Sequence, residues 1–167
     1  MLEMLQKEVE YDSKYYDEWL STYKRHHLDF DEWQQLKGIK VKENPFILYE
    51  NELQPVIQKY ISMIEKIKKM WKVCYHTKDW NGKVSNKIED CCKYSIQLFI
   101  QIQNIDKKYN VDPMTYCEGS YKLILLYQRR GDIQKAIDIC NDSIAMSPAE
   151  ERYKRKKESL INMIKRK

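Results

Sequence analysis

The sequence predicts an all-α fold, and three observations lead to this prediction. The chain of 167 residues holds only four glycines and four prolines, whereas an all-β fold needs more turn-forming residues. Its longer apolar patterns recur at the three- and four-residue spacing of helices. Short turn signals separate these patterns, so consecutive helices are expected to pair as antiparallel hairpins.

Composition and cysteine content set the broad class of protein. Hydrophobic residues make up 43% of the chain and charged residues 33%, which is typical of a soluble globular protein and argues against a disordered one. No apolar run reaches the ~18 residues of a membrane span, and the acidic N-terminus lacks the apolar core of a signal peptide. We therefore expect a cytoplasmic protein with no membrane partner. The five cysteines lack regular spacing, which favours reduced, buried thiols over a disulfide framework.

The first 49 residues are predicted to form an N-terminal helical segment and a linker. Ser13 is expected to cap a helix that runs to about His26. Asp29 or Asp31 caps a second, short helix that ends near Gly38. Residues 39–49 alternate briefly and contain a proline, so we expect an extended linker there, with room for a short strand.

Residues 50–167 are predicted to form a domain of helical hairpins, beginning with a long pair. The first helix covers 52–75 and holds Pro55 in its first turn, where the missing N–H does no harm. Residues 76–83 form the turn, in which Asn81 and Gly82 tolerate positive φ. Ser85 caps the second helix, which runs to about Tyr109. The apolar stripes that should pack together are Leu53, Ile57, Tyr60, Ile61, Ile64, Ile67, Trp71 and Cys74 on the first helix, and Ile88, Cys91, Cys92, Ser95, Leu98, Phe99, Ile102 and Ile105 on the second.

A shorter hairpin follows, with helices over 115–129 and 133–146. Gly131 lies between them and can end the first helix in the left-handed conformation. Asp132 is then expected to cap the second helix, and Ala136 lets the two backbones approach closely.

The last helix is predicted to begin at SPAE, residues 147–150, and to run to about Ile164. Ser147 would cap it, with Pro148 at the first helical position and Glu150 completing a capping box. The net charge of +5 is concentrated in this helix, because residues 149–167 hold eight Lys/Arg and three Asp/Glu, while the rest of the chain balances to zero. Residues 1–50 are acidic, with seven basic and eleven acidic side chains.

A family pattern covers residues 117–150. Its matching positions are Leu123, Tyr127, Gly131, Ala136 and Pro148. At these offsets the segment resembles a single tetratricopeptide (TPR) repeat, a helix-turn-helix unit of ~34 residues. Cys140 stands where the pattern has an aromatic residue, and Ser120 and Ile124 replace its tryptophan and first glycine.

The resemblance implies both an architecture and a function. The hairpins would stack in a TPR-like right-handed array, with the basic C-terminal helix as its cap. Such repeats are non-enzymatic modules that bind a peptide or helix of a partner along the first helix, or that self-associate. The partner-binding positions would be Glu118, Tyr121, Leu125, Gln128 and Arg129. The competing interpretation makes Tyr121 and Leu125 core residues packed against 84–109.

Two other functions remain open from the sequence. The basic stretch 152–157 indicates a nucleic-acid-associated or regulatory protein, in which Arg152, Arg155 and Lys156 would contact phosphate. The chain is also compatible with an accessory domain of an enzyme complex. We expect no catalytic residues, no cofactor and no metal. The spacing of Cys74, His76, Cys91 and Cys92 matches no zinc pattern, and the four glycines lie singly, so there is no phosphate-binding loop.

Overall fold

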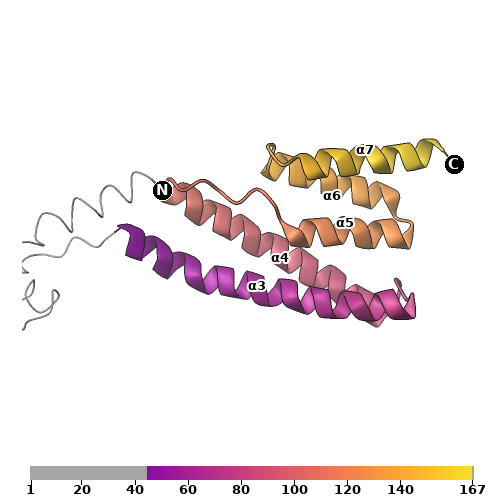
Figure 1. Ribbon diagram of the computed structural model, residues 1–167, viewed down its shortest axis with the longest axis horizontal. Coiled ribbons are helices and arrows are strands. Elements are labelled where there is room, and N and C mark those ends of the chain that lie inside the picture. The colour runs from indigo at the N-terminus through magenta and orange to yellow at the C-terminus, as the bar shows by residue number, and fades with distance from the viewer. Residues whose placement is uncertain (1–44, 167) are drawn as a thin grey trace, which may run out of the picture. The chain divides into compact units, whose positions relative to one another are not determined.

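The computed structural model describes residues 45–166, and this part of the chain is all-α, as predicted, with no strand among these residues. The helices expected at 13–38 lie outside the described residues. The described helices are α3 (Pro45–Thr77), α4 (Lys83–Lys108), α5 (Glu118–Arg130), α6 (Ile133–Met146) and α7 (Glu151–Lys165), shown in Figure 1. None of them combines the length and the apolar character that crossing a membrane requires.

The chain divides into two compact units, Met1–Leu53 with Ile105–Asp112 and Gln54–Asn104 with Pro113–Lys167. In the first unit, the start of α3 and the end of α4 share polar contacts. The Tyr49 hydroxyl donates a hydrogen bond to Asp106 over 2.9 Å, and Lys108 Nζ lies 2.6 Å from Glu52 Oε2. The second unit holds the remaining helices and all of the predicted site residues.

Helix α3 is longer than the sequence indicated. It begins at Pro45, so the predicted extended linker is wrong for residues 45–49. Proline fits the first helical position because its fixed φ is already helical. The sequence predicts Pro55 in a first turn, but Pro55 lies inside the helix, where proline costs about 3 kcal/mol. The turns beyond it bury Tyr60, Ile64 and Ile67, which offsets that cost.

The α3–α4 hairpin has the predicted core and a different turn. On α4, Ile88, Cys92 and Phe99 are fully buried, which confirms the stripe. On α3, Ile61 is 51% exposed, so the buried stripe is narrower than predicted.

In the turn, positive φ falls on Lys78, at 56°, and not on Asn81 or Gly82. The Asp79 carboxylate organises this turn by accepting a hydrogen bond from the Asn81 N–H over 3.2 Å. Ser85 does not cap α4. It lies within the first turn, where its hydroxyl donates to the Gly82 carbonyl over 2.9 Å.

The turn between α5 and α6 confirms the expectation for its glycine. Gly131 ends α5 with φ 84° and ψ 2°, and its N–H donates to the Gln128 carbonyl. Asp132 occupies the cap position of α6, but its side chain makes no capping hydrogen bond. Its carboxylate lies 3.4 Å from Lys135 Nζ instead. Ala136 is fully buried.

The start of α7 differs from the predicted capping box. Ser147 ends α6, and its hydroxyl accepts a hydrogen bond from the Gln103 side chain of α4 over 3.2 Å. Ser147 thus makes a tertiary contact and does not cap α7, and Pro148 lies in the connection rather than at the first helical position. Helix α7 begins at Glu151, and Glu150 caps it by accepting from the Arg152 N–H over 3.2 Å.

Helices α4 and α5 approach closely at Gly119. A Cβ atom there would lie 1.8 Å from the Ser95 hydroxyl oxygen and 3.2 Å from the Cys92 carbonyl oxygen. Alanine ordinarily stabilises a helix by about 1 kcal/mol relative to glycine. Here we expect Gly119→Ala to lower the free energy of unfolding by about 1–3 kcal/mol through overpacking, measured by urea denaturation.

A second substitution tests whether this crossing is responsible. Ser95→Ala removes the oxygen that a Cβ at Gly119 would meet, so it should recover part of the lost stability when it is combined with Gly119→Ala. A stabilising effect of Gly119→Ala alone would contradict the close approach.

Candidate functional site

The predicted partner-binding residues lie together on one side of α5. We call Glu118, Tyr121, Leu125, Gln128 and Arg129 the α5 surface. The first four are half-buried and Arg129 is exposed. The buried side of α5 is formed by other residues, namely Gly119, Ser120, Leu123, Ile124, Leu126 and Tyr127. Tyr121 and Leu125 therefore do not belong to the fully buried core.

Helix α3 flanks one edge of the α5 surface. Lys68 Nζ lies 3.1 Å from the Glu118 carboxylate, and the Glu118 backbone N–H donates to the Tyr60 hydroxyl over 3.1 Å. Lys122 lies 5.0 Å above the centre of the Trp71 ring. These contacts fix the start of α5 against the middle of α3 and leave two lysines beside the α5 surface.

Helix α7 flanks the other edge. Lys156 Nζ donates to Gln128 Oε1 over 2.6 Å, and Gln128 Nε2 donates to the Met163 sulfur over 3.4 Å. Desolvation lowers the pKa of Lys156, and the nearby charge of Arg129 lowers it further. The structure thus joins a predicted partner-binding residue to a predicted phosphate-binding one.

The three candidate phosphate-binding side chains have different surroundings. Arg152 is largely exposed, 3.5 Å from the Glu150 carboxylate and 4.5 Å from the centre of the Tyr116 ring. Arg155 is exposed, and Lys156 is half-buried against Gln128. Tyr116 also lies 6.0 Å from the Tyr121 ring, centre to centre. Arg152 and the α5 surface therefore share an aromatic neighbour.

Aromatic residues extend the α5 surface at its C-terminal end. The Arg129 guanidinium lies 5.6 Å from the centre of the Trp80 ring, and Trp80 lies 5.2 Å from Trp71. Sequence reasoning missed Lys68, Lys122 and this pair of tryptophans. Lys68, Lys122 and Trp71 lie on helices and Trp80 lies in the turn between α3 and α4, and nothing local indicates which of these segments become neighbours.

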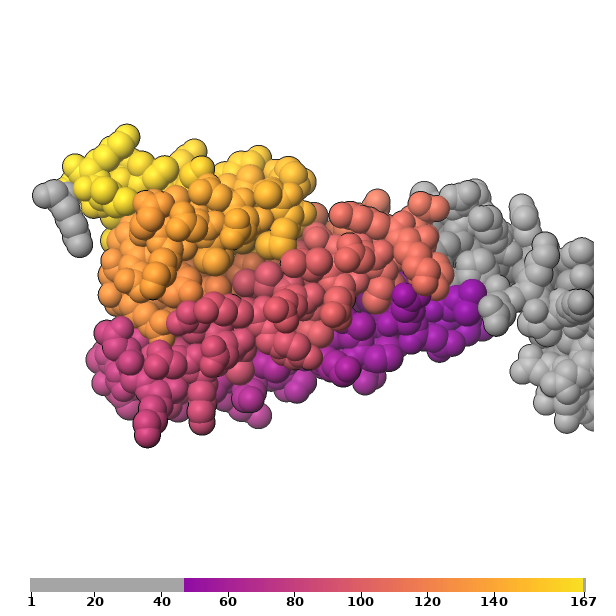
Figure 2. All heavy atoms as spheres, turned by 180° about the vertical axis from the view of Figure 1, so that it is seen from behind, coloured from indigo at the N-terminus to yellow at the C-terminus, as the bar shows by residue number. Residues whose placement is uncertain are grey.

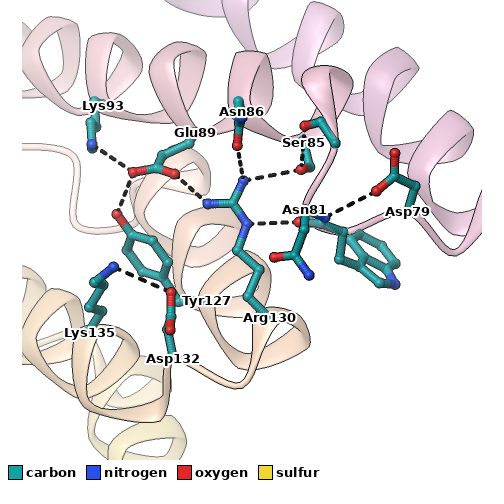
Figure 3. Close-up of polar contacts among 12 residues, drawn as sticks. Asp79, Asn81, Ser85, Asn86, Glu89, Lys93, Tyr127, Arg130, Asp132 and Lys135 are labelled. Atoms are coloured by element: carbon teal, nitrogen blue, oxygen red, sulfur yellow. Dashed lines mark hydrogen bonds and ion pairs between the residues drawn. The ribbon is translucent and has the colours of Figure 1, made fainter.

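A polar network behind the α5 surface connects the end of α5 to the start of α4 (Figure 3). The Arg130 guanidinium pairs with the Glu89 carboxylate and donates to the Trp80 carbonyl over 2.8 Å. It also donates to Ser85 Oγ over 3.1 Å and to Asn86 Oδ1 over 2.9 Å. Only 9% of the Arg130 side chain is exposed, so the network anchors α5 from a nearly buried position.

Glu89 has further partners within this network. Its carboxylate accepts from the Tyr127 hydroxyl over 2.8 Å and from Lys93 Nζ over 2.7 Å. Burial by itself raises the pKa of Glu89, but hydrogen bonds from Lys93, Tyr127 and Arg130 outweigh it and lower the pKa to about 2. Desolvation and the bond to Glu89 raise the pKa of Tyr127 to about 12. At neutral pH the site therefore holds an ionised carboxylate and an intact phenol.

The cysteines occupy apolar surroundings. All five are buried and none is in a disulfide. Burial raises the pKa of the Cys92 and Cys117 thiols and that of Cys140 to about 11. A thiolate is the nucleophilic form of cysteine, so burial favours the protonated, less nucleophilic form of these three side chains. Among the described residues, no three His, Cys, Asp or Glu side chains gather as metal ligands would.

Comparison of the chain with protein-family models, with curated proteins and with solved structures finds no significant match. The site is a partly exposed helix face, edged by lysines and aromatic rings and held from behind by a partly buried ion pair.

Proposed function

We propose that the chain is a non-enzymatic interaction module that docks a peptide or helix of a partner protein on the α5 surface. One observation carries the proposal: five side chains of α5 lie between contacts to α3 and contacts to α7, and remain only partly buried. Tyrosine and arginine, both present there, are residue types enriched at the energetic centres of interfaces.

The charges around the α5 surface indicate the character of the partner. Lys68, Lys122 and Lys156 lie at its edges, and Arg129 lies within it. Glu118 is its one acidic member, and Lys68 already pairs with it. Complementary potentials steer association and select partners, so the favoured partner is an acidic segment that also offers apolar side chains to Leu125 and Tyr121.

The same contacts support the TPR-like architecture as part of this proposal. Helix α5 contacts α3 and α7, which are the first helices of the neighbouring hairpins in chain order. The left-handed Gly131 and the fully buried Ala136 occupy the turn and close-approach positions of a TPR unit. The basic helix α7 would then cap the array in a cytoplasmic protein.

A paired substitution tests the proposed site. Tyr121→Ala with Arg129→Ala should lower recovery of the native partner from cell extract at least tenfold, because it removes the two favoured anchor types. The recovered protein is identified by mass spectrometry. Tyr94→Ala with Lys87→Ala is the matched control, since both residues are exposed on α4. Equal melting temperatures of the two double variants would show that neither result comes from unfolding. Unchanged partner recovery with the Tyr121→Ala, Arg129→Ala variant would refute the proposed site.

The alternative functions give different results in companion measurements. Arg152 and Arg155 are exposed, which favours nucleic acid as the second candidate. In that case, replacing Arg152, Arg155 and Lys156 with glutamine should weaken binding of labelled RNA or DNA and flatten its salt dependence. Self-association would appear as a concentration-dependent mass in light scattering. An accessory domain would recover an enzyme subunit as its partner.

A further inference from the structure

The C-terminal end of the α5 surface brings two positively charged side chains near each other. Gln128 Oε1 accepts a hydrogen bond from Lys156 Nζ of α7 over 2.6 Å, and Arg129 follows Gln128 in the chain. Burial lowers the pKa of Lys156, and the nearby charge of Arg129 lowers it further. In Figure 2 the yellow residues of α7 lie beside the orange residues of α5 and α6. We call Gln128, Arg129 and Lys156 the donor cluster.

The two cations of the donor cluster have no carboxylate partner in the part of the chain that the structure describes. Other half-buried cations have one: Arg130 pairs with Glu89, and Lys154 Nζ lies 2.7 Å from the Glu151 carboxylate. Lys156 is half-buried too, but its acceptor is a neutral amide. A partly desolvated ammonium group without a counter-charge is costly, so the cluster favours an incoming anion.

The donor cluster also has N–H groups that an anion can use. The Arg129 guanidinium lies 5.6 Å from the centre of the Trp80 ring, and its five N–H donors meet no acceptor among the described residues. Gln128 Nε2 donates to the Met163 sulfur over 3.4 Å, which is a weak acceptor. Lys156 uses one of three N–H groups on Gln128. Three side chains can therefore donate to one ligand.

The charge of the donor cluster favours a phosphate monoester over a carboxylate. A phosphorylated serine carries a charge of about −1.5 to −2 at neutral pH and three strong acceptor oxygens. It can therefore compensate both cations, whereas a carboxylate leaves one positive charge uncompensated. Arginine forms two parallel hydrogen bonds with phosphate, and lysine binds it as a point charge.

The rest of the α5 surface favours a protein as the carrier of the phosphate. Leu125 lies one turn before Arg129 on the same side of α5, and Tyr121 lies one turn before Leu125. Both side chains are half-buried and offer apolar contacts next to the donor cluster. Glu118, at the far end of the α5 surface, is acidic, which suits a peptide with one phosphate better than a polyanionic nucleic-acid backbone.

We propose that the donor cluster binds a phosphoserine of the partner segment that docks on the α5 surface. This inference rests on the proposed function and adds that the partner is recognised in its phosphorylated form. The phosphate lies between Arg129 and Lys156, and an apolar side chain of the same segment packs on Leu125.

An NMR titration of the full chain with N-acetyl-O-phosphoserine amide tests the proposal. We expect saturable shifts of the side-chain N–H signals of Arg129 and Gln128, with a dissociation constant on the order of millimolar for so small a ligand. N-acetylaspartic acid amide, with a single negative charge, should bind at least fivefold more weakly. The proposal is overturned if the phosphoserine probe gives no saturable shift or if the aspartate probe binds as well.

Thymidine 5′-monophosphate distinguishes a protein from a nucleic acid, because it carries the same phosphate group on a nucleoside. We expect it to bind no more tightly than the phosphoserine probe. Tighter binding of the nucleotide would assign the donor cluster to nucleic acid and overturn the proposal.

Substitutions locate the phosphate. Arg129→Gln with Lys156→Gln should weaken binding of the phosphoserine probe at least tenfold while the backbone spectrum stays that of the folded protein. Lys69→Gln with Lys72→Gln is the matched control, because these two lysines are exposed on α3, and it should leave binding unchanged. Retained binding in the first variant, or equal weakening in the control, would mean that overall charge attracts the probe and would overturn the assignment.

Phosphatase treatment separates this inference from the proposed function. Dephosphorylating the cell extract with a serine/threonine phosphatase, which is removed before the chain is added, should lower partner recovery at least tenfold. If recovery survives this treatment but is lost in the Tyr121→Ala, Arg129→Ala variant, the proposed function stands and the phosphoserine inference is wrong. If that variant retains recovery and the phosphoserine probe still shifts the donor cluster of the parent chain, the docking site is refuted and the phosphate site is supported.

Discussion

Arg130→Met is expected to lower the free energy of unfolding by about 3 kcal/mol. The substitution keeps the aliphatic stem and removes the charge that pairs with Glu89. It also removes hydrogen bonds to the Trp80 carbonyl, Ser85 and Asn86. Breaking a buried ion pair from one side costs about 3–5 kcal/mol because the remaining charge stays desolvated. Glu89 keeps its hydrogen bonds from Lys93 and Tyr127, so we expect a loss of stability at the lower end of this range. Urea denaturation at neutral pH measures it.

The same network predicts how stability depends on pH. The pKa of Glu89 is about 2 in the folded chain, below its ordinary unfolded value of about 4.3. A depressed carboxyl pKa stabilises the fold fully above the unfolded value, and this contribution is lost as pH falls towards 2. We expect Glu89→Gln to remove that part of the acid sensitivity between about pH 4.5 and 2, because glutamine does not titrate.

A matched surface pair serves as the control for Arg130→Met. Lys135 and Asp132 lie 3.4 Å apart with side chains 64% and 42% exposed. Exposed ion pairs contribute about 0–1 kcal/mol, so Lys135→Met should have little effect. If Arg130→Met were as mild as this control, the network would not anchor α5 to α4.

Tyr153→Ala is expected to lower the free energy of unfolding by about 3–5 kcal/mol, as truncating a fully buried aromatic side chain does. Tyr153 is 1% exposed and is the largest of the fully buried side chains among the described residues. Its hydroxyl accepts from the Cys117 N–H over 2.8 Å and donates to the Cys117 carbonyl over 3.0 Å. This one side chain of α7 therefore both fills the core and satisfies the backbone at the start of α5.

Tyr153→Phe separates these two contributions. It keeps the ring and leaves the Cys117 backbone groups without the hydroxyl, so a loss of about 1–3 kcal/mol is expected. Tyr94→Ala is the control, since Tyr94 is 43% exposed and should change stability by about 0.5 kcal/mol or less. A Tyr153→Phe variant as stable as the parent would mean that the backbone of Cys117 finds other partners.

The sequence predicted local features well where the conformation depends on a single residue or on the apolar periodicity of one helix. The positive φ of Gly131 and the buried stripe of α4 were expected from the sequence and are confirmed. Predictions failed where a distant residue intervenes. Ser147 was predicted to cap a helix, and a side chain 44 residues earlier, Gln103, holds its hydroxyl instead.

The candidate site shows the same division. The sequence placed five residues on one side of a helix, because helical periodicity fixes which side chains share a face. It gave no means of finding Lys68 or Lys156 beside them, or the pairing of Arg130 with Glu89. Those neighbours are 28 to 50 residues away in the chain, and no local pattern encodes such contacts.

By itself, the sequence determined the all-α class, the main helices, the left-handed turn and the concentration of positive charge near the C-terminus. Each depends on backbone preference or on periodicity over a few residues. The tertiary structure alone decided that Pro55 lies within a helix, that α5 contacts both α3 and α7, and that Arg130 pairs with Glu89. These outcomes depend on which apolar faces pack together, and that choice is made by the summed burial of the whole chain rather than by any one segment.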